Sequence, residues 1–381
     1  MKRLCLLAVM LFTVVILPFP VQAAQLQTAG KSAALMDVAT GTLLYESDSH
    51  ARLAPASVTK VMTMLLIMEA VDSGKISMTD TVTASEAAAA KGGSQIYLKV
   101  GETMSVSDML KSIAVSSAND CACAMAEHIA GSEEAFVSQM NQRAAELGML
   151  DTHFVNCTGL DDGENASEHK TSAYDIALMS RELMKNHPDI KKFTTIWMDT
   201  VRNGTFGLSN TNKLIRFYPG ATGLKTGFTS GAGYCLSATA ERDGMELIAV
   251  VMGAESSDIR NTACKQLLDY GFANYALVSP MPEGEPSVEV KLGTAEQVRL
   301  VPGEMPKLLI DKGLKNSLTT EITLSEPVTA PVSPGQQLGR LTVRAGDQIL
   351  SQVPLVAETE VPRLSWGQLF ALVMKEISMG N

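Results

Sequence analysis

The sequence has 381 residues and a formal net charge of −10 at pH 7, from 31 basic and 41 acidic side chains. This length exceeds what one hydrophobic core usually organises, so we expect two domains. The acidic balance argues against a nucleic-acid partner, because a phosphate backbone attracts basic surfaces.

The chain begins with the anatomy of an export signal. Lys2 and Arg3 precede an apolar run from Leu4 to Leu17, and small residues around Ala23 offer a cleavage site. We therefore predict a signal peptide over residues 1–23. The mature protein is then expected at the outer face of the cytoplasmic membrane, or in the periplasm or cell-wall space.

Cysteine usage and histidine spacing indicate neither a disulfide framework nor a metal site. One of the six cysteines falls in the predicted signal, and the odd number that remains cannot all pair. Cys121 and Cys123 stand in an apolar, alanine-rich stretch, where a thiol acts as a small hydrophobic side chain. The five histidines are scattered, without an H-E-x-x-H run. We expect no metal ion and no cofactor.

The next region alternates strand and helix patterns. A hairpin is predicted over 33–46 around Thr40-Gly41, and Pro55 then begins a helix that is apolar from Val61 to Met68, which is typical of a helix buried on most sides. Strands at both ends with helices between them predict one antiparallel sheet completed by the two chain ends, with an inserted helical subdomain. The later elements are helices over 120–130, 133–147, 173–186 and 258–270, and strands over 233–239 and 245–251 that flank an Asp243-Gly244 turn.

Composition changes after Val278. A proline- and glycine-rich linker precedes period-two runs such as 288–292 and 338–343, which predict a small all-β domain. We place this domain at 279–361, after a first domain at 24–278.

The tail over 362–381 predicts an amphipathic helix, too short to span a bilayer. Our main interpretation is an anchor on the outer surface of the cytoplasmic membrane, and the alternative is a helix docked on its own domain. One face carries Trp366, Leu369, Phe370, Val373 and Ile377, whereas Gln368, Lys375 and Glu376 take the opposite side.

Ser57 and Lys60 form the first of three motifs that carry chemistry. A serine hydroxyl is a weak nucleophile and needs a base within hydrogen-bond reach, and positions i and i+3 share a helix face. Lysine serves as a base only if its pKa falls, which burial and a neighbouring cation such as Lys225 favour. The Ser57 N–H at the helix start can face an oxyanion. The same spacing from Ser167 to Lys170 lies among polar residues, so we interpret it as accidental.

The second and third motifs are Ser117-Ala118-Asn119 and Lys225-Thr226-Gly227. Ser117 and Asn119 have an ordinary interpretation as helix N-caps, which is compatible with proton relay by Ser117 and substrate binding by Asn119. Lys225 beside the hydroxyls of Thr226 and Thr229 is suited to a carboxylate, and a glycine at 227 lets a substrate backbone approach closely.

In this order, the three motifs resemble those of the serine-type D-alanyl-D-alanine carboxypeptidases, the low-molecular-mass penicillin-binding proteins. The resemblance covers about 33–274 and extends more loosely to the β domain and the terminal helix. It implies an α+β fold with a β-lactamase/transpeptidase-like domain, in which an antiparallel sheet has helices on both faces and a helical subdomain. A small all-β domain and a C-terminal amphipathic helix follow.

The resemblance also implies a role for each motif residue. Ser57 is acylated by the penultimate D-alanine of a peptidoglycan stem peptide, Lys60 is the base, and Ser117 and Asn119 assist. Lys225, Thr226 and Thr229 hold the terminal carboxylate. Phe228 and Ser57 supply backbone amides for the oxyanion, with Gly227 between Thr226 and Phe228. β-Lactam antibiotics are then covalent inhibitors. Phe228 replaces the polar residue of some members, which affects fine substrate preference.

Two alternatives belong to other functional classes. A class A β-lactamase needs a glutamate that activates the deacylating water, and Glu182 to Asn186 matches E-x-x-x-N by spacing. That match continues a helical pattern, so we interpret it as accidental. A non-catalytic penicillin-binding sensor or scaffold is the other alternative, although none of the motifs is degraded.

Overall fold

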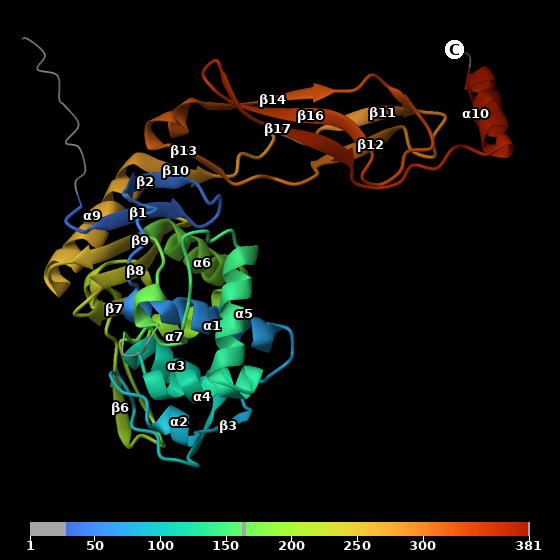
Figure 1. Cartoon of the computed structure of the whole chain (residues 1–381). Coiled ribbons are helices and arrows are strands. Elements are labelled where there is room, and N and C mark those ends of the chain that lie inside the picture. Colours follow the sequence, from blue (N-terminus) through green and yellow to red (C-terminus); the bar gives the residue numbers. More distant parts are fainter. Residues whose placement is uncertain (1–27, 162–164, 380–381) are drawn as a thin grey trace, which may run out of the picture.

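The computed structural model describes residues 28–161 and 165–379, so the predicted signal peptide lies outside the described residues. Two bodies follow one another along the chain (Figure 1): a globular one that holds β1 to α9, and an elongated β-rich arm that ends in α10.

The globular body is organised around one five-stranded antiparallel sheet with strand order β2-β1-β9-β8-β7. The expected hairpins at both ends of the region are confirmed, and β1 pairs with β9 to join them. The sheet is therefore completed by the two ends of the domain, with β7 at one edge. Its strands are β1 (Ser32–Asp37), β2 (Leu43–Ser47), β7 (Ala221–Thr229), β8 (Gly233–Arg242) and β9 (Met245–Ala254).

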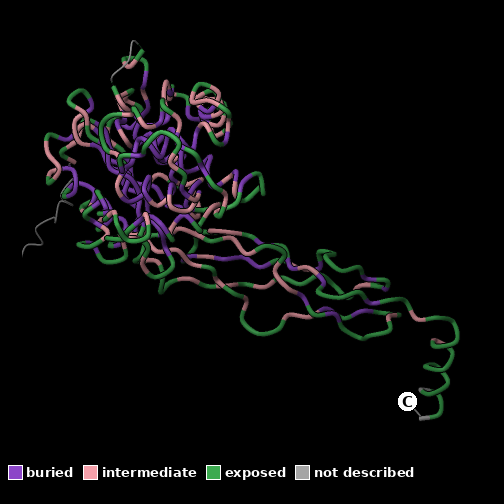
Figure 2. Tube along the Cα trace, turned by 90° about the horizontal axis from the view of Figure 1, so that it is seen from below, coloured by how far each residue is buried: buried purple, intermediate pink, exposed green. Residues whose placement is uncertain are grey.

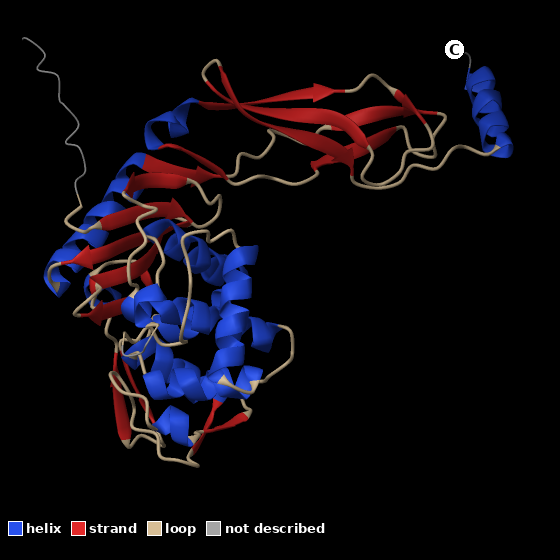
Figure 3. Ribbon diagram, in the orientation of Figure 1, coloured by secondary structure: helices blue, strands red, loops and turns tan. Residues whose placement is uncertain are grey.

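Helices cover both faces of this sheet, as expected (Figure 3). α9 (Ser257–Asn274) packs on one face, where β8 and β9 contribute Leu236 and Leu247 to the core. α6 (Ala173–Asn186) and α1 (Lys60–Asp72) lie on the other. From Lys60 to Met68 every α1 side chain is buried, because one face of the helix packs toward the sheet and the opposite face packs against the helical subdomain. The start of α1 is thus held at the centre of the fold.

The helical subdomain packs against α1 away from the sheet. Its main helices are α3 (Val106–Ser116), α4 (Asn119–Ala130) and α5 (Glu133–Glu146). The expected helices over 120–130 and 133–147 correspond closely to α4 and α5, whereas α3 was not predicted as a separate helix. The smaller elements are α2 (Glu86–Ala89), α7 (Lys191–Thr194), α8 (Leu214–Phe217) and the two-stranded pairs β3 (Thr81–Thr83) with β4 (Thr103–Ser105) and β5 (Met198–Val201) with β6 (Phe206–Ser209).

The arm is all-β, as the period-two runs predict. Its sheet has the order β14-β16-β17-β12-β11-β15, over a small core that includes Leu341 and Leu355. β10 (Tyr275–Val278) pairs with β13 (Leu308–Asp311), so the arm is joined to the globular body next to a two-stranded ribbon. The remaining strands are β11 (Ser287–Lys291), β12 (Gln297–Pro302), β14 (Leu318–Leu324), β15 (Val328–Thr329), β16 (Gln337–Ala345) and β17 (Gln348–Ala357).

The terminal helix α10 (Trp366–Met379) lies beyond the far end of the arm (Figure 2). Its apolar side chains face solvent: Trp366 is 88% exposed, and Phe370 and Ile377 are each 68% exposed. The alternative of a helix docked on its own domain is therefore wrong. Among the described residues, no helix combines the length and hydropathy needed to cross a membrane.

Candidate active site

Ser57 lies in a short 3₁₀ turn (Ala56–Thr59) that leads directly into α1. The preceding residue, Ala56, has φ 49°, in the left-handed region that costs an L-residue energy. Thr59 Oγ1 braces the turn by donating to the Ala56 carbonyl oxygen at 2.8 Å. Gly159 packs against the same carbonyl, and a side chain there would collide with it. The strained turn is thus fixed by its surroundings.

His169 extends this brace. The Val155 N–H donates to Nδ1 at 3.1 Å, so the proton is on Nε2, which donates to Thr59 Oγ1 at 2.8 Å. Burial lowers the pKa of His169 to about 4, with smaller contributions from nearby cations including Lys60. The ring is therefore neutral at physiological pH and serves to hold the turn.

The Lys60 amine contacts Ser57 as the motif spacing predicts. Its Nζ is 3.0 Å from Ser57 Oγ and donates to the Thr158 carbonyl oxygen at 2.8 Å. The side chain is fully buried, and this burial lowers the pKa of Lys60 from 10.5 to about 7, against the opposing pull of Cys157 and Asp120. A large neutral fraction is thus present at neutral pH, as a base requires.

Ser117 and Asn119 lie at the junction of α3 and α4. Ser117 ends α3 with φ 63°, and the residue that caps α4 is Ala118, without a side-chain hydrogen bond. The N-cap interpretation of Ser117 and Asn119 is therefore wrong. Both side chains are buried, yet Ser117 Oγ and Asn119 Oδ1 have no hydrogen-bond partner within residues 28–161 and 165–379. Buried polar atoms of this kind are rare in proteins, and each has bonding capacity that a ligand group or a water molecule can use.

Lys225 to Thr229 lie in the second half of the edge strand β7, which contacts the Ser57 turn. Burial lowers the pKa of Lys225 well below its usual value, and repulsion from Lys60 and Arg260 lowers it further. No carboxylate among the described residues forms an ion pair with Lys225. An anion bound beside Lys225 would oppose this shift, because a nearby negative charge favours the protonated amine.

Thr226, Phe228 and Thr229 on β7 differ in their side-chain contacts. Thr226 Oγ1 donates to Thr211 Oγ1 at 2.7 Å, whereas Thr229 Oγ1 accepts from the Ala232 N–H at 3.1 Å within the turn to β8. The Phe228 ring is 54% exposed and stacks on Tyr234 with 4.3 Å between ring centroids. The Thr226 hydroxyl thus gives its proton to Thr211, whereas the Thr229 hydroxyl accepts in the turn and keeps its own proton for a carboxylate.

Three groups at the site were not predicted from the sequence: Arg260, Thr211 and the Thr158 carbonyl. Arg260 is only 5% exposed on α9 and acts on Lys225 through charge, while Thr211 contacts Thr226. None of them stands in a short motif, and a main-chain carbonyl has no side-chain signature in a sequence.

The surroundings of the two accidental motif matches differ from those of Ser57 and Lys60. Ser167 is exposed in a short 3₁₀ turn that ends at Glu168, and the next helix, α6, begins only at Ala173. Glu182 is inside α6, where its carboxylate accepts from Arg143 at 2.7 Å and from Asn186 Nδ2 at 2.9 Å. The helical interpretation of the E-x-x-x-N match is confirmed, and its glutamate is bound to neighbours on α5 and α6.

Comparison with known proteins agrees with this geometry. Residues 20–256 match the family described as D-alanyl-D-alanine carboxypeptidase, and residues 275–363 match the penicillin-binding protein 5 C-terminal domain. The chain is 44% identical to D-alanyl-D-alanine carboxypeptidase DacF of Bacillus subtilis over 377 residues, which cover 95% of each chain. It is 34% identical to DacC of Escherichia coli, with 86% of this chain and 83% of that protein covered.

Solved structures resemble the whole chain and the globular body separately. Penicillin binding protein 5 from Haemophilus influenzae has a TM-score of 0.72 at 30% identity, covering 88% of this chain and 98% of the other. Penicillin-binding protein D2 from Listeria monocytogenes, solved in an ampicillin-bound form, has a TM-score of 0.59 at 32% identity, covering 65% and 99%. The chain therefore belongs to the D-alanyl-D-alanine carboxypeptidases, serine hydrolases of the penicillin-binding protein class.

Proposed function

We propose that Ser57 is the nucleophile that removes the terminal D-alanine from peptidoglycan stem peptides. The single observation that carries this assignment is the contact between Ser57 Oγ and the buried Lys60 amine at 3.0 Å. Neutral Lys60 takes the proton as Ser57 Oγ bonds to the penultimate D-alanine carbonyl carbon. The peptide C–N bond then breaks, and the departing D-alanine amine receives a proton through Ser117. Water finally hydrolyses the ester and frees Ser57.

In this proposal, separate protein groups bind the oxyanion, the terminal carboxylate and an amide of the substrate. The Ser57 and Phe228 N–H groups face the developing oxyanion, and Gly227 leaves room for it. The terminal carboxylate lies against Lys225 and the hydroxyls of Thr226 and Thr229, and its charge opposes the loss of the Lys225 proton that burial favours. Asn119 Oδ1, which is buried and has no partner in the described part of the chain, accepts from a substrate amide.

Acylation by a β-lactam tests the nucleophile and separates the alternatives. After incubation with benzylpenicillin, intact-protein mass spectrometry is expected to give one stable adduct, which peptide mapping places on Ser57. A persistent adduct is expected because Glu182 is tied to Arg143 and Asn186, so no glutamate of that motif activates water. Rapid loss of the adduct would favour the lactamase, and an adduct on another residue would contradict the assignment.

We also propose that the protein is exported and attached to the outer surface of the cytoplasmic membrane through α10. Three facts support this: an apolar run follows Lys2 and Arg3, the arm carries α10 away from the globular body, and the apolar face of α10 is exposed.

A further inference from the structure

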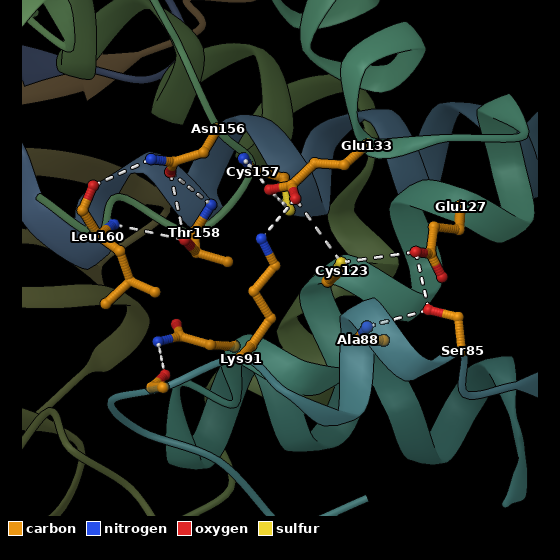
Figure 4. A network of polar contacts seen from close by, with 12 residues as sticks. Ser85, Ala88, Lys91, Cys123, Glu127, Glu133, Asn156, Cys157, Thr158 and Leu160 are labelled. Carbon is orange, nitrogen blue, oxygen red and sulfur yellow. Dashed lines mark hydrogen bonds and ion pairs between the residues drawn. The ribbon is translucent and has the colours of Figure 1, made fainter. Parts of the chain in front are cut away.

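Several polar groups converge on the carboxylate of Glu133, the first residue of α5 (Figure 4). Glu133 Oε2 accepts from Lys91 Nζ at 2.5 Å and lies 3.7 Å from Cys123 Sγ. Glu133 Oε1 accepts from the Cys157 N–H and from Cys157 Sγ, both at 3.2 Å. One carboxylate therefore joins the segment after α2, helix α4 and the loop that holds Cys157.

The Cys157 side of this network leads to the proposed base. The next residue along the chain is Thr158, whose carbonyl oxygen accepts from Lys60 Nζ at 2.8 Å. The Cys157 carbonyl oxygen accepts from Thr63 Oγ1 on α1 at 2.6 Å. Glu133 thus binds the backbone N–H of Cys157, while the carbonyl oxygens of Cys157 and Thr158 accept hydrogen bonds from side chains of α1. A displacement of Cys157 would move the carbonyl that orients the Lys60 amine.

The Lys91 side leads to the proposed substrate amide site. Lys91 is followed directly by Gly92, whose carbonyl oxygen accepts from Asn119 Nδ2 at 2.7 Å. The Asn119 N–H donates to the Ser94 carbonyl oxygen, also at 2.7 Å. A Cβ at Gly93 would lie 2.8 Å from Asn119 Nδ2, so this loop fits closely against Asn119. The position of Lys91 therefore helps to fix the orientation of the Asn119 amide.

We propose that the ion pair between Lys91 and Glu133 positions Lys60 and Asn119 for acylation, by holding the two loops that contact them. Both are positioning residues, because they act through Thr158 and Gly92. The inference rests on the proposed function of Lys60 and Asn119.

The surroundings of the pair favour a geometric role. Burial disfavours both charges, yet the hydrogen bond between them raises the pKa of Lys91 and lowers the pKa of Glu133. The side chains are 24% and 17% exposed, so the pair is partly shielded from solvent. Such a pair restricts the backbone of the two segments that it joins. Small displacements of a reacting group reduce reaction rates strongly.

The test compares three variants of the full chain with a matched control. Lys91→Met and Glu133→Gln remove the ion pair with little change in volume, and Lys91→Arg keeps the charge. Glu69→Gln is the control, since Glu69 on α1 accepts from Arg143 at 2.7 Å with similar exposure, and Arg143 lies near the other end of the helix that Glu133 begins. Release of D-alanine from a peptide ending in D-Ala-D-Ala, acylation by benzylpenicillin and the thermal midpoint are measured for each.

The expected result is a fall in kcat and in the acylation rate constant of about 10- to 100-fold for Lys91→Met and Glu133→Gln, with little change in KM. Lys91→Arg recovers most of the rate, and Glu69→Gln keeps it despite a similar shift of the thermal midpoint. Wild-type rates in Lys91→Met and Glu133→Gln, no recovery in Lys91→Arg, or an equal loss in Glu69→Gln would each overturn the inference. A wild-type protein that releases no D-alanine would instead contradict the proposed function.

Discussion

Gly227 on β7 lies against the backbone nitrogen of Ser57: a Cβ built at Gly227 would be 3.1 Å from that nitrogen and 2.7 Å from the Pro55 carbonyl oxygen. The edge strand and the nucleophile turn therefore approach as closely as they do only because position 227 has no side chain. The gap between them is where we place the oxyanion.

Gly227→Ala is expected to lower acylation by benzylpenicillin by about 100-fold, because β7 must move away from the Pro55 carbonyl and carries the Phe228 N–H with it. Stopped-flow measurement of the acylation rate checks this result. Gly231→Ala is the control, since a Cβ at Gly231 would meet its nearest neighbour, Asp161, at an ordinary 3.6 Å. An unchanged rate in Gly227→Ala would contradict the proposed oxyanion site.

The acylation rate is expected to depend on pH through Lys60. Burial lowers the pKa of Lys60 from 10.5 to about 7, and only the neutral amine accepts the Ser57 proton. The rate should therefore be nearly constant above pH 8 and fall by about tenfold per pH unit well below pH 7. Acylation by benzylpenicillin between pH 5 and about 9 measures the profile. A rate that rises only near pH 10 would show that Lys60 keeps its ordinary pKa and is not the base.

Lys225→Ala is expected to weaken the use of substrates with a free terminal carboxylate. The loss of one charge-assisted contact corresponds to a fall in kcat/KM of about 10- to 100-fold. A matched substrate whose terminal carboxylate is a carboxamide should be used equally by wild type and variant, because it lacks the charge that Lys225 binds. Equal losses on both substrates would indicate a structural role for Lys225.

Removal of residues 362–381 is expected to abolish binding to lipid vesicles and leave D-alanine release from a soluble peptide unchanged. The apolar face of α10 is exposed at the far end of the arm, and the site residues lie in the globular body. Co-sedimentation with zwitterionic vesicles measures binding. Retained binding after the deletion would contradict membrane attachment through α10.

Local sequence patterns predicted those parts of the fold that depend on local chemistry. The Asp243-Gly244 turn sits between two apolar strands, and the apolar run from Val61 to Met68 fixed the burial of α1, so both were identified correctly. Ser57 and Lys60 belong to one helical turn, which is why their contact followed from spacing alone.

The rest of the site depends on contacts between distant segments. Arg260 approaches Lys225 only because α9 packs across β8 and β9, and no spacing rule connects these residues. Ser117 resembles a helix cap in sequence, but its left-handed backbone ends α3 instead. The pairing of Lys91 with Glu133 likewise required the loop after α2 to reach the start of α5.

Release of D-alanine by wild-type protein and by Ser57→Ala tests the central claim most directly. The substrate is a peptide ending in D-Ala-D-Ala, and free D-alanine is assayed over time. We predict release by the wild type and none above background by the variant, with the two proteins equal in thermal midpoint. Release by a folded Ser57→Ala protein would contradict the assignment of Ser57 as the nucleophile.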